Sequence, residues 1–246
     1  MKKLLLLGLL LATSFAFAVP TQLGFSGGFT VPTAEIQQGV SLTMIVDETE
    51  NFSMGAPMTM SATEKLPQTL LTFGFGKSFE ACIGYHKREL NFGGPSIDFS
   101  TTNASLKYAL PWTIRNGKLA IGVDYDTTSS GMTTSRWIGL LSGTFPAFNK
   151  DTTFTASMLF PSGDTYPVAT GGNSTGYGFA LERKLPNKGT VGVEYIFNSP
   201  NYYHVWENDF GTIYATVPFS DMFTGRLALT GINDEAKLAY SLTANF

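Results

Sequence analysis

The last eleven residues of the chain, 236–246, alternate between two kinds of side chain. One parity carries Leu238, Tyr240, Leu242, Ala244 and Phe246, and the other carries Ala239, Ser241, Thr243 and Asn245. Because successive side chains of a strand point to opposite faces, this alternation predicts a strand with one apolar and one polar face. A strand of about 9–11 residues is also long enough to cross a bilayer at a tilt.

The same two-residue period recurs along the chain and predicts twelve strands. Their expected ranges are 39–48, 69–77, 79–89, 100–110, 117–127, 134–145, 152–160, 175–185, 189–198, 209–219, 223–231 and 236–246. The connections between them alternate between short turns and longer segments, as in membrane barrels with short periplasmic turns and long extracellular loops. We therefore expect loops 49–68 and 161–174 to face the cell exterior, and the turn around residue 187 to face the periplasm.

The composition favours strands over membrane helices. Hydrophobic residues make up 43% of the chain and charged residues 14%, yet after residue 18 no apolar run reaches the roughly 20 residues that a membrane helix requires. In lipid every backbone polar group must be paired within the protein, and a closed sheet achieves this. A soluble β-sandwich also alternates, but its loops would not differ so consistently in length. The predicted fold class is all-β: a transmembrane antiparallel β-barrel of about 12 strands.

The beginning of the chain predicts export. Lys2 and Lys3 precede an apolar run, and Ala16-Phe17-Ala18 is a small-x-small cleavage site, so residues 1–18 are expected to be a signal peptide. Residues 19–246 are then one barrel domain. Because bacterial single-chain barrels have an even number of strands, residues 19–37 are expected not to span the membrane. They form either a periplasmic lead-in or a segment inserted into the lumen.

The last strand, which ends on Phe246, resembles the closing strand of Gram-negative outer-membrane β-barrel proteins. The resemblance implies an outer-membrane location, contacts with lipid and lipopolysaccharide, and an assembly signal at Tyr240, Leu242 and Phe246 for the outer-membrane assembly machinery. The stretch Gly28–Ala34, followed by Gly39, also resembles over about a dozen residues the opening motif of YjbH-type barrels, which are associated with exopolysaccharide secretion.

With the apolar parity outward, the charged residues of the strands gather on the inner face. The predicted lumen-lining residues are Glu80, His86, Arg88, Lys107, Asp124, Asp126, Arg136, Glu182, Lys184, Glu194 and Arg226. Burying unpaired charge in a dry core is costly, so these positions favour a wet interior. Inward glycines such as Gly74, Gly122 and Gly178 leave room inside the barrel.

One cross-strand contact is expected within this set. The loop 128–133 is nearly symmetric about Ser130, which places Asp124 opposite Arg136 on adjacent strands, where opposite charges attract. The alternative is a register shifted by one or two residues.

The function favoured by these patterns is a narrow, passive channel for small hydrophilic solutes, with its ion preference set by inward charges. The first alternative is a non-conducting barrel with a role in envelope structure or surface-polysaccharide export. The second is a lipid-modifying enzyme, which would need a His close to a Ser nucleophile; neither His86 nor His204 has a Ser two residues on. No catalytic, cofactor-binding or metal-binding residue is predicted, and no basic patch suggests nucleic acid.

Overall fold

The computed structural model of the 246-residue chain describes residues 21, 25–28, 30–47, 50–53, 59–91, 96–130, 133–163, 175–186, 188–198, 209–232 and 236–246. The predicted signal peptide 1–18 lies outside these residues, and so do His204 and most of the predicted loop 161–174. Within the described part of the chain, no helix has the length and apolar character needed to cross a membrane.

Thirteen strands are present in the described residues. They are β1 (Gly39–Asp47), β2 (Glu50–Ser53), β3 (Thr59–Phe75), β4 (Phe79–Asn91), β5 (Ser96–Ile114), β6 (Gly117–Ser129), β7 (Thr133–Ala147), β8 (Asn149–Gly163), β9 (Gly176–Lys184), β10 (Thr190–Phe197), β11 (Phe210–Pro218), β12 (Phe223–Thr230) and β13 (Lys237–Asn245).

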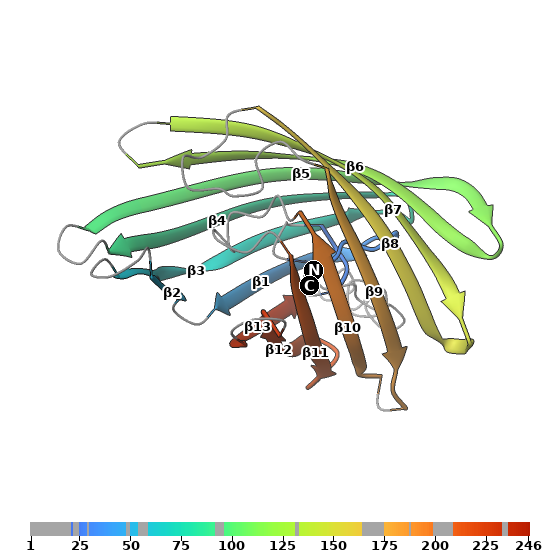
Figure 1. Ribbon diagram of the computed structural model, residues 1–246. Helices are drawn as coiled ribbons and strands as arrows, with labels where there is room; N and C mark the ends of the chain where they lie inside the picture. Colours follow the sequence, from blue (N-terminus) through green and yellow to red (C-terminus); the bar gives the residue numbers. More distant parts are fainter. Residues whose placement is uncertain are drawn as a thin grey trace, which may run out of the picture.

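The strands form one antiparallel sheet that closes on itself (Figure 1). From β3 to β13 each strand pairs with the next along the chain, and β1 pairs with both β13 and β3. The ring therefore contains twelve strands, β1 and β3–β13, while β2 is a four-residue strand that pairs with the start of β3. The predicted fold class is confirmed: the protein is a closed twelve-stranded antiparallel β-barrel.

Several strands are longer than the sequence predicts, and the extra length carries proline. β3 begins at Thr59, ten residues before its predicted start, and its pairing with β4 shifts register on both sides of Leu66, next to Pro67. β5 extends to Ile114 through Pro111, with a register shift between Ala109 and Thr113. The predicted loop 49–68 is therefore wrong in part, because β2 and the first half of β3 occupy much of it. Bulges accommodate these prolines within the sheet, and the two-residue period alone does not reveal them.

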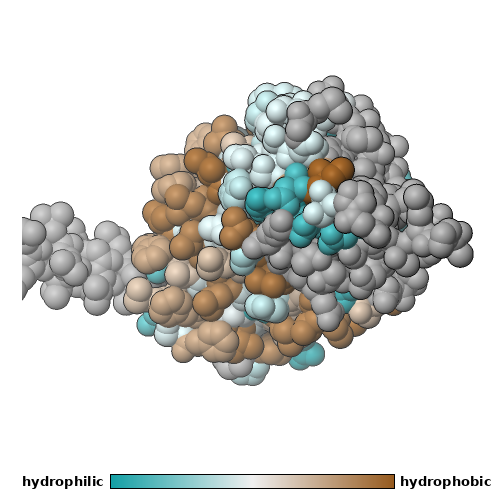
Figure 2. Space-filling view, turned by 90° about the vertical axis from the view of Figure 1, so that its left-hand side faces the viewer, coloured by the Kyte–Doolittle hydropathy of each residue, from teal (hydrophilic) through white to brown (hydrophobic). Residues whose placement is uncertain are grey.

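The two faces of the sheet differ sharply in character. Large hydrophobic side chains are exposed on the outer face of nearly every barrel strand, among them Leu106 on β5, Trp137 on β7 and Ile213 on β11. Figure 2 shows hydrophobic side chains over much of the described surface on one side of the molecule. The alternate side chains point inward and are buried, and many of them are Ser, Thr or charged residues. An apolar exterior around a polar interior is the reverse of a soluble protein and suits a lipid environment.

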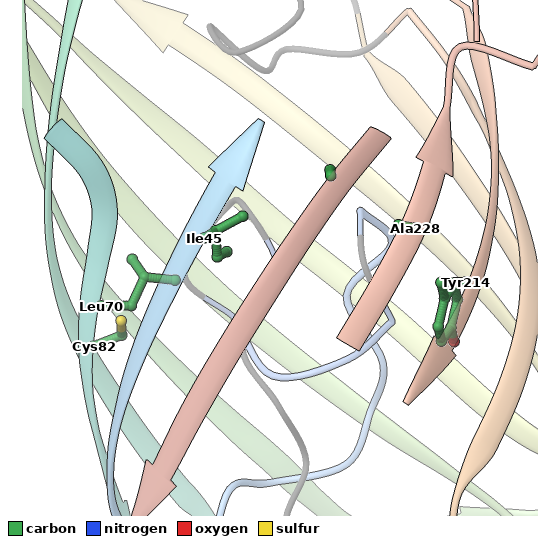
Figure 3. Packing of buried hydrophobic residues seen from close by; sticks show 6 residues of the cluster. Ile45, Leu70, Cys82, Tyr214 and Ala228 are labelled. Carbon is green, nitrogen blue, oxygen red and sulfur yellow. The ribbon is translucent and has the colours of Figure 1, made fainter. Parts of the chain in front are cut away.

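The interior also holds two apolar clusters. One contains Ile45, Leu70, Cys82, Tyr214, Ala228 and Ala239, which come from β1, β3, β4, β11, β12 and β13 (Figure 3). The other joins Phe25, which precedes β1, to Ile138, Leu140, Leu159 and Ile196. The second cluster explains why apolar residues of β7 share the inward parity: they pack against a segment that lies inside the barrel.

Candidate functional site: the barrel interior

Residues 25–28 and 30–38, called here the inner segment, lie within the barrel. All of them are buried except Glu35 and Gln38, which are partly exposed. The segment folds back on itself through an antiparallel bridge between Gly27 and Pro32. The amide of Gly28 donates to the carbonyl of Val31 (3.1 Å), and that of Thr33 donates to the carbonyl of Ser26 (3.2 Å). This compact turn leaves other backbone N–H and C=O groups directed at the barrel wall.

A buried ion pair on β4 and β5 binds one side of the inner segment. Glu80 and Lys107 are paired in the sheet register, and their charged groups lie 3.4 Å apart with side chains almost fully buried. Glu80 accepts hydrogen bonds from the amides of Ser26 (2.7 Å) and Gln37 (2.6 Å). Lys107 donates to the carbonyls of Ser26 (3.0 Å) and Thr33 (3.3 Å), and to the Ser26 hydroxyl. One acid–base pair thus holds both ends of the turn.

A second acid and base bind the segment from the opposite wall. Glu194 on β10 accepts hydrogen bonds from the amide (2.8 Å) and the hydroxyl (2.7 Å) of Thr30. Arg226 on β12 donates to the carbonyls of Gly28 (2.6 Å) and Gly27 (3.1 Å). β10 lies six strands from β4 in the ring of twelve, so the inner segment bridges the lumen from wall to wall.

Hydroxyl groups of β7 and β8 bind the segment between these two walls. Ser142 and Ser157 both donate to the carbonyl of Pro32, and the Thr144 hydroxyl accepts from the amide of Ala34 (2.9 Å). A further ion pair joins Glu35 to Lys118 at 2.6 Å, with both side chains about half exposed.

Glycines of the wall make space for the segment. A Cβ at Gly122 would lie 2.9 Å from the Phe25 ring, and one at Gly178 would lie 3.0 Å from the Val31 side chain. A Cβ at Gly74 would collide with the carbonyl of Gln37. The room that inward glycines leave is thus taken up by the inner segment.

β5, β6 and β7 carry a separate cluster of buried polar side chains. Asp126 is the direct cross-strand partner of Arg136, and the two charged groups are 3.6 Å apart. The predicted pairing of Asp124 with Arg136 is wrong, since Asp124 faces Ile138 and the register is shifted by two residues. Asp124 Oδ1 instead accepts a hydrogen bond from Asn103 at 3.3 Å. All three acidic and basic groups are buried, so Arg136 points inward as expected.

The other predicted lumen residues differ in their surroundings. His86 and Arg88 on β4 are buried, with His86 opposite Thr101. Glu182 on β9 is partly buried and accepts a hydrogen bond from the Tyr214 hydroxyl, whereas Lys184, at the end of β9, is exposed. Among the eleven predicted residues, Glu80, Lys107, Glu194 and Arg226 form hydrogen bonds to the inner segment.

The three residues of the predicted assembly signal lie on the outer face of β13 and just after it. Tyr240, Leu242 and Phe246 are all exposed. The backbone of Phe246 pairs with Val40 at the start of β1, and its amide donates to the Val40 carbonyl at 2.8 Å. The end of the chain thus contributes to the seam where the barrel closes.

Sequence analysis missed the neutral residues of the site, namely Ser142, Thr144, Ser157 and the small residues of the inner segment. The available signal was the inward run of Ser and Thr on β7 and β8, which carries no charge. The inward apolar pair Ile138 and Leu140 was a second signal, because apolar side chains inside a polar lumen need an apolar partner.

No family model matches the sequence, and no curated protein matches it. Solved structures do match. A KdgM porin in complex with disordered oligogalacturonate is 8% identical with a TM-score of 0.54, covering 84% of this chain and 99% of that one. Another KdgM porin structure is 7% identical with a TM-score of 0.51, covering 84% and 98%. A NanC porin is 10% identical with a TM-score of 0.51, covering 85% and 99%. The chain therefore has the fold of outer-membrane porin barrels.

Proposed function

We propose that the protein is an outer-membrane channel of the porin type for small hydrophilic solutes, and that the inner segment restricts its lumen. Twelve strands about 4.8 Å apart and tilted by about 40° give a backbone radius on the order of 12 Å, so the lumen is narrow. The outer face of the barrel would then contact lipid and lipopolysaccharide. The outer-membrane assembly machinery would recognise β13 and Phe246.

The observation that carries this proposal is the polar content of the interior. Charged and hydroxyl side chains line the barrel from β4 to β12, and the inner segment satisfies many of them. A purely structural barrel has no need for ionisable groups inside, since burying them carries a desolvation cost. The apolar outer surface and the porin fold support the membrane location, and the sugar ligand of the KdgM porin supports a hydrophilic solute.

The non-conducting alternative draws on one specific observation, that the inner segment bridges opposite walls. Planar-bilayer recording on refolded protein separates the two functions. We expect a low conductance from the full chain and a higher one from a variant lacking residues 20–36. The absence of conductance in both forms would refute the channel and leave a role in envelope structure or polysaccharide export.

A further inference from the structure

The barrel binds the inner segment mainly through the segment's main chain. Glu80 accepts from two backbone amides, and Glu194 accepts from a third. Lys107 and Arg226 each donate to two backbone carbonyls. The wall therefore presents carboxylates to N–H groups and cations to C=O groups.

Three polar side chains of the segment add to these main-chain contacts. The hydroxyls of Ser26 and Thr30 bind Lys107 and Glu194, and Glu35 pairs with Lys118. At Gly28 the main chain itself approaches the wall closely. A Cβ at Gly28 would collide with the Glu194 carboxylate of the wall, whereas one at Gly27 would meet the Val31 carbonyl of the segment's own turn at 2.6 Å. Two side chains fill shaped spaces, Phe25 beside Gly122 and Val31 beside Gly178. The wall thus binds mainly the N–H and C=O groups of a peptide backbone.

The charges of this set balance. Glu80 and Glu194 are matched by Lys107 and Arg226, and the two acid–base groups occupy opposite walls. An acidic sugar chain would be attracted by the two cations but repelled by the two carboxylates, so this balanced set does not favour a polyanion. A peptide offers both donors and acceptors and carries opposite charges at its two ends, so it matches a balanced set.

We infer that the lumen binds the main chain of short peptides and that the inner segment is an intramolecular occupant of this site. Short peptides are then the class of solute for this channel, a step that rests on the proposed function. When the segment is displaced, Glu80, Lys107, Glu194 and Arg226 become available to a peptide from outside the chain.

The test measures peptide binding directly, so that it does not depend on conduction. A fluorescently labelled peptide with the sequence of residues 24–37 is added to the variant lacking residues 20–36, refolded in detergent, and its anisotropy is followed. The matched control is the same peptide with methyl groups on the amide nitrogens that correspond to Ser26 and Thr30. This control keeps every side chain and removes one backbone donor to Glu80 and the backbone donor to Glu194, while the Gln37 amide and the Thr30 hydroxyl remain.

We expect the unmodified peptide to bind the deletion variant, and the methylated peptide to bind at least about tenfold more weakly, because hydrogen bonds to charged groups are lost. Binding to the full chain should be weaker by at least about tenfold, since the tethered segment competes at an effective concentration on the order of millimolar. A neutral oligosaccharide of similar size should not displace the peptide.

Equal binding of the methylated and unmodified peptides would overturn the inference, and so would displacement by the oligosaccharide. If the deletion variant does not fold, the full chain with Phe25→Ala and Val31→Ala replaces it, because these substitutions loosen the segment without changing the wall. Failure of the two proposals is distinguishable. Conduction without peptide binding refutes the peptide site alone, whereas peptide binding without conduction refutes the channel.

Discussion

Glu80 and Lys107 form an ion pair inside the barrel, with 3.4 Å between the carboxylate and the ammonium group. Both side chains also bind backbone groups of the inner segment, so each charge interacts with the opposite charge and with main-chain dipoles. Burying a pair of charges is tolerable only when hydrogen bonds satisfy the remaining lone pairs and protons. The pair therefore depends on the inner segment as much as the segment depends on the pair.

Replacing Lys107 with Met is expected to lower the free energy of unfolding by about 3–5 kcal/mol, because Glu80 is left buried without its cation. Lys118→Met is the matched control, since the pair of Lys118 with Glu35 is about half exposed and contributes about 0–1 kcal/mol. Denaturant titration of tryptophan fluorescence in detergent measures both. Equal effects of the two substitutions would contradict the structural importance of the buried pair.

Gly28→Ala is expected to increase the conductance of the full chain. The new methyl group would collide with the carboxylate of Glu194, which must move or release Thr30. Gly139→Ala on β7 is the control, because its Cβ would meet Phe160 at an ordinary 3.5 Å. Single-channel recording on both variants distinguishes them, and unchanged currents in Gly28→Ala would argue that the segment does not restrict the lumen.

The topology follows from the phase of the strands and is tested on intact cells. Epitope tags inserted at residues 55 and 168 should be labelled from outside, and a tag at residue 187 should be labelled only after the outer membrane is permeabilised. Cys82 is buried, so cysteine labelling at the same positions is a second method with a silent background. The reverse labelling pattern would show that the barrel has the opposite orientation in the membrane.

Phe246→Ala is expected to reduce the amount of barrel assembled in cells while leaving refolding in detergent nearly unchanged. The Phe246 ring is exposed, and its backbone, which the substitution preserves, makes the bonds to Val40. The shift in electrophoretic mobility on heating measures the folded fraction, both in membrane fractions from cells and after refolding in detergent. A matching loss in both would assign Phe246 to stability instead of to recognition by the assembly machinery.

The facing of the strands could be predicted from the sequence, whereas one strand pairing could not. Inward and outward positions depend on a period of two, and a register shift of two residues leaves that period unchanged. For this reason Arg136 is buried as expected, although its partner is Asp126 and not Asp124. The pairing depends on where the chain turns between β6 and β7, and symmetry about Ser130 located that turn wrongly.

The two-residue alternation of the sequence also could not predict where the inner segment lies. Its residues are mostly small, and Pro32 interrupts any alternation, so the pattern left open whether it lies in the periplasm or in the lumen. What holds it in the barrel are bonds from its main chain to Glu80, Lys107, Glu194 and Arg226. Main-chain contacts are invisible in a sequence, because every residue except proline carries the same N–H and C=O groups.

The unequal strand lengths have a consequence for the membrane around the protein. β10 and β12 have eight residues each, whereas β3 has 17 and β5 has 19. At a rise of about 3.3 Å per residue and a tilt of about 40°, eight residues span roughly 20 Å, less than the apolar band of about 25 Å typical of such barrels. Lipid next to β10 and β12 must therefore thin locally or the barrel must lean toward that side, while β3 and β5 are long enough to extend beyond the apolar band.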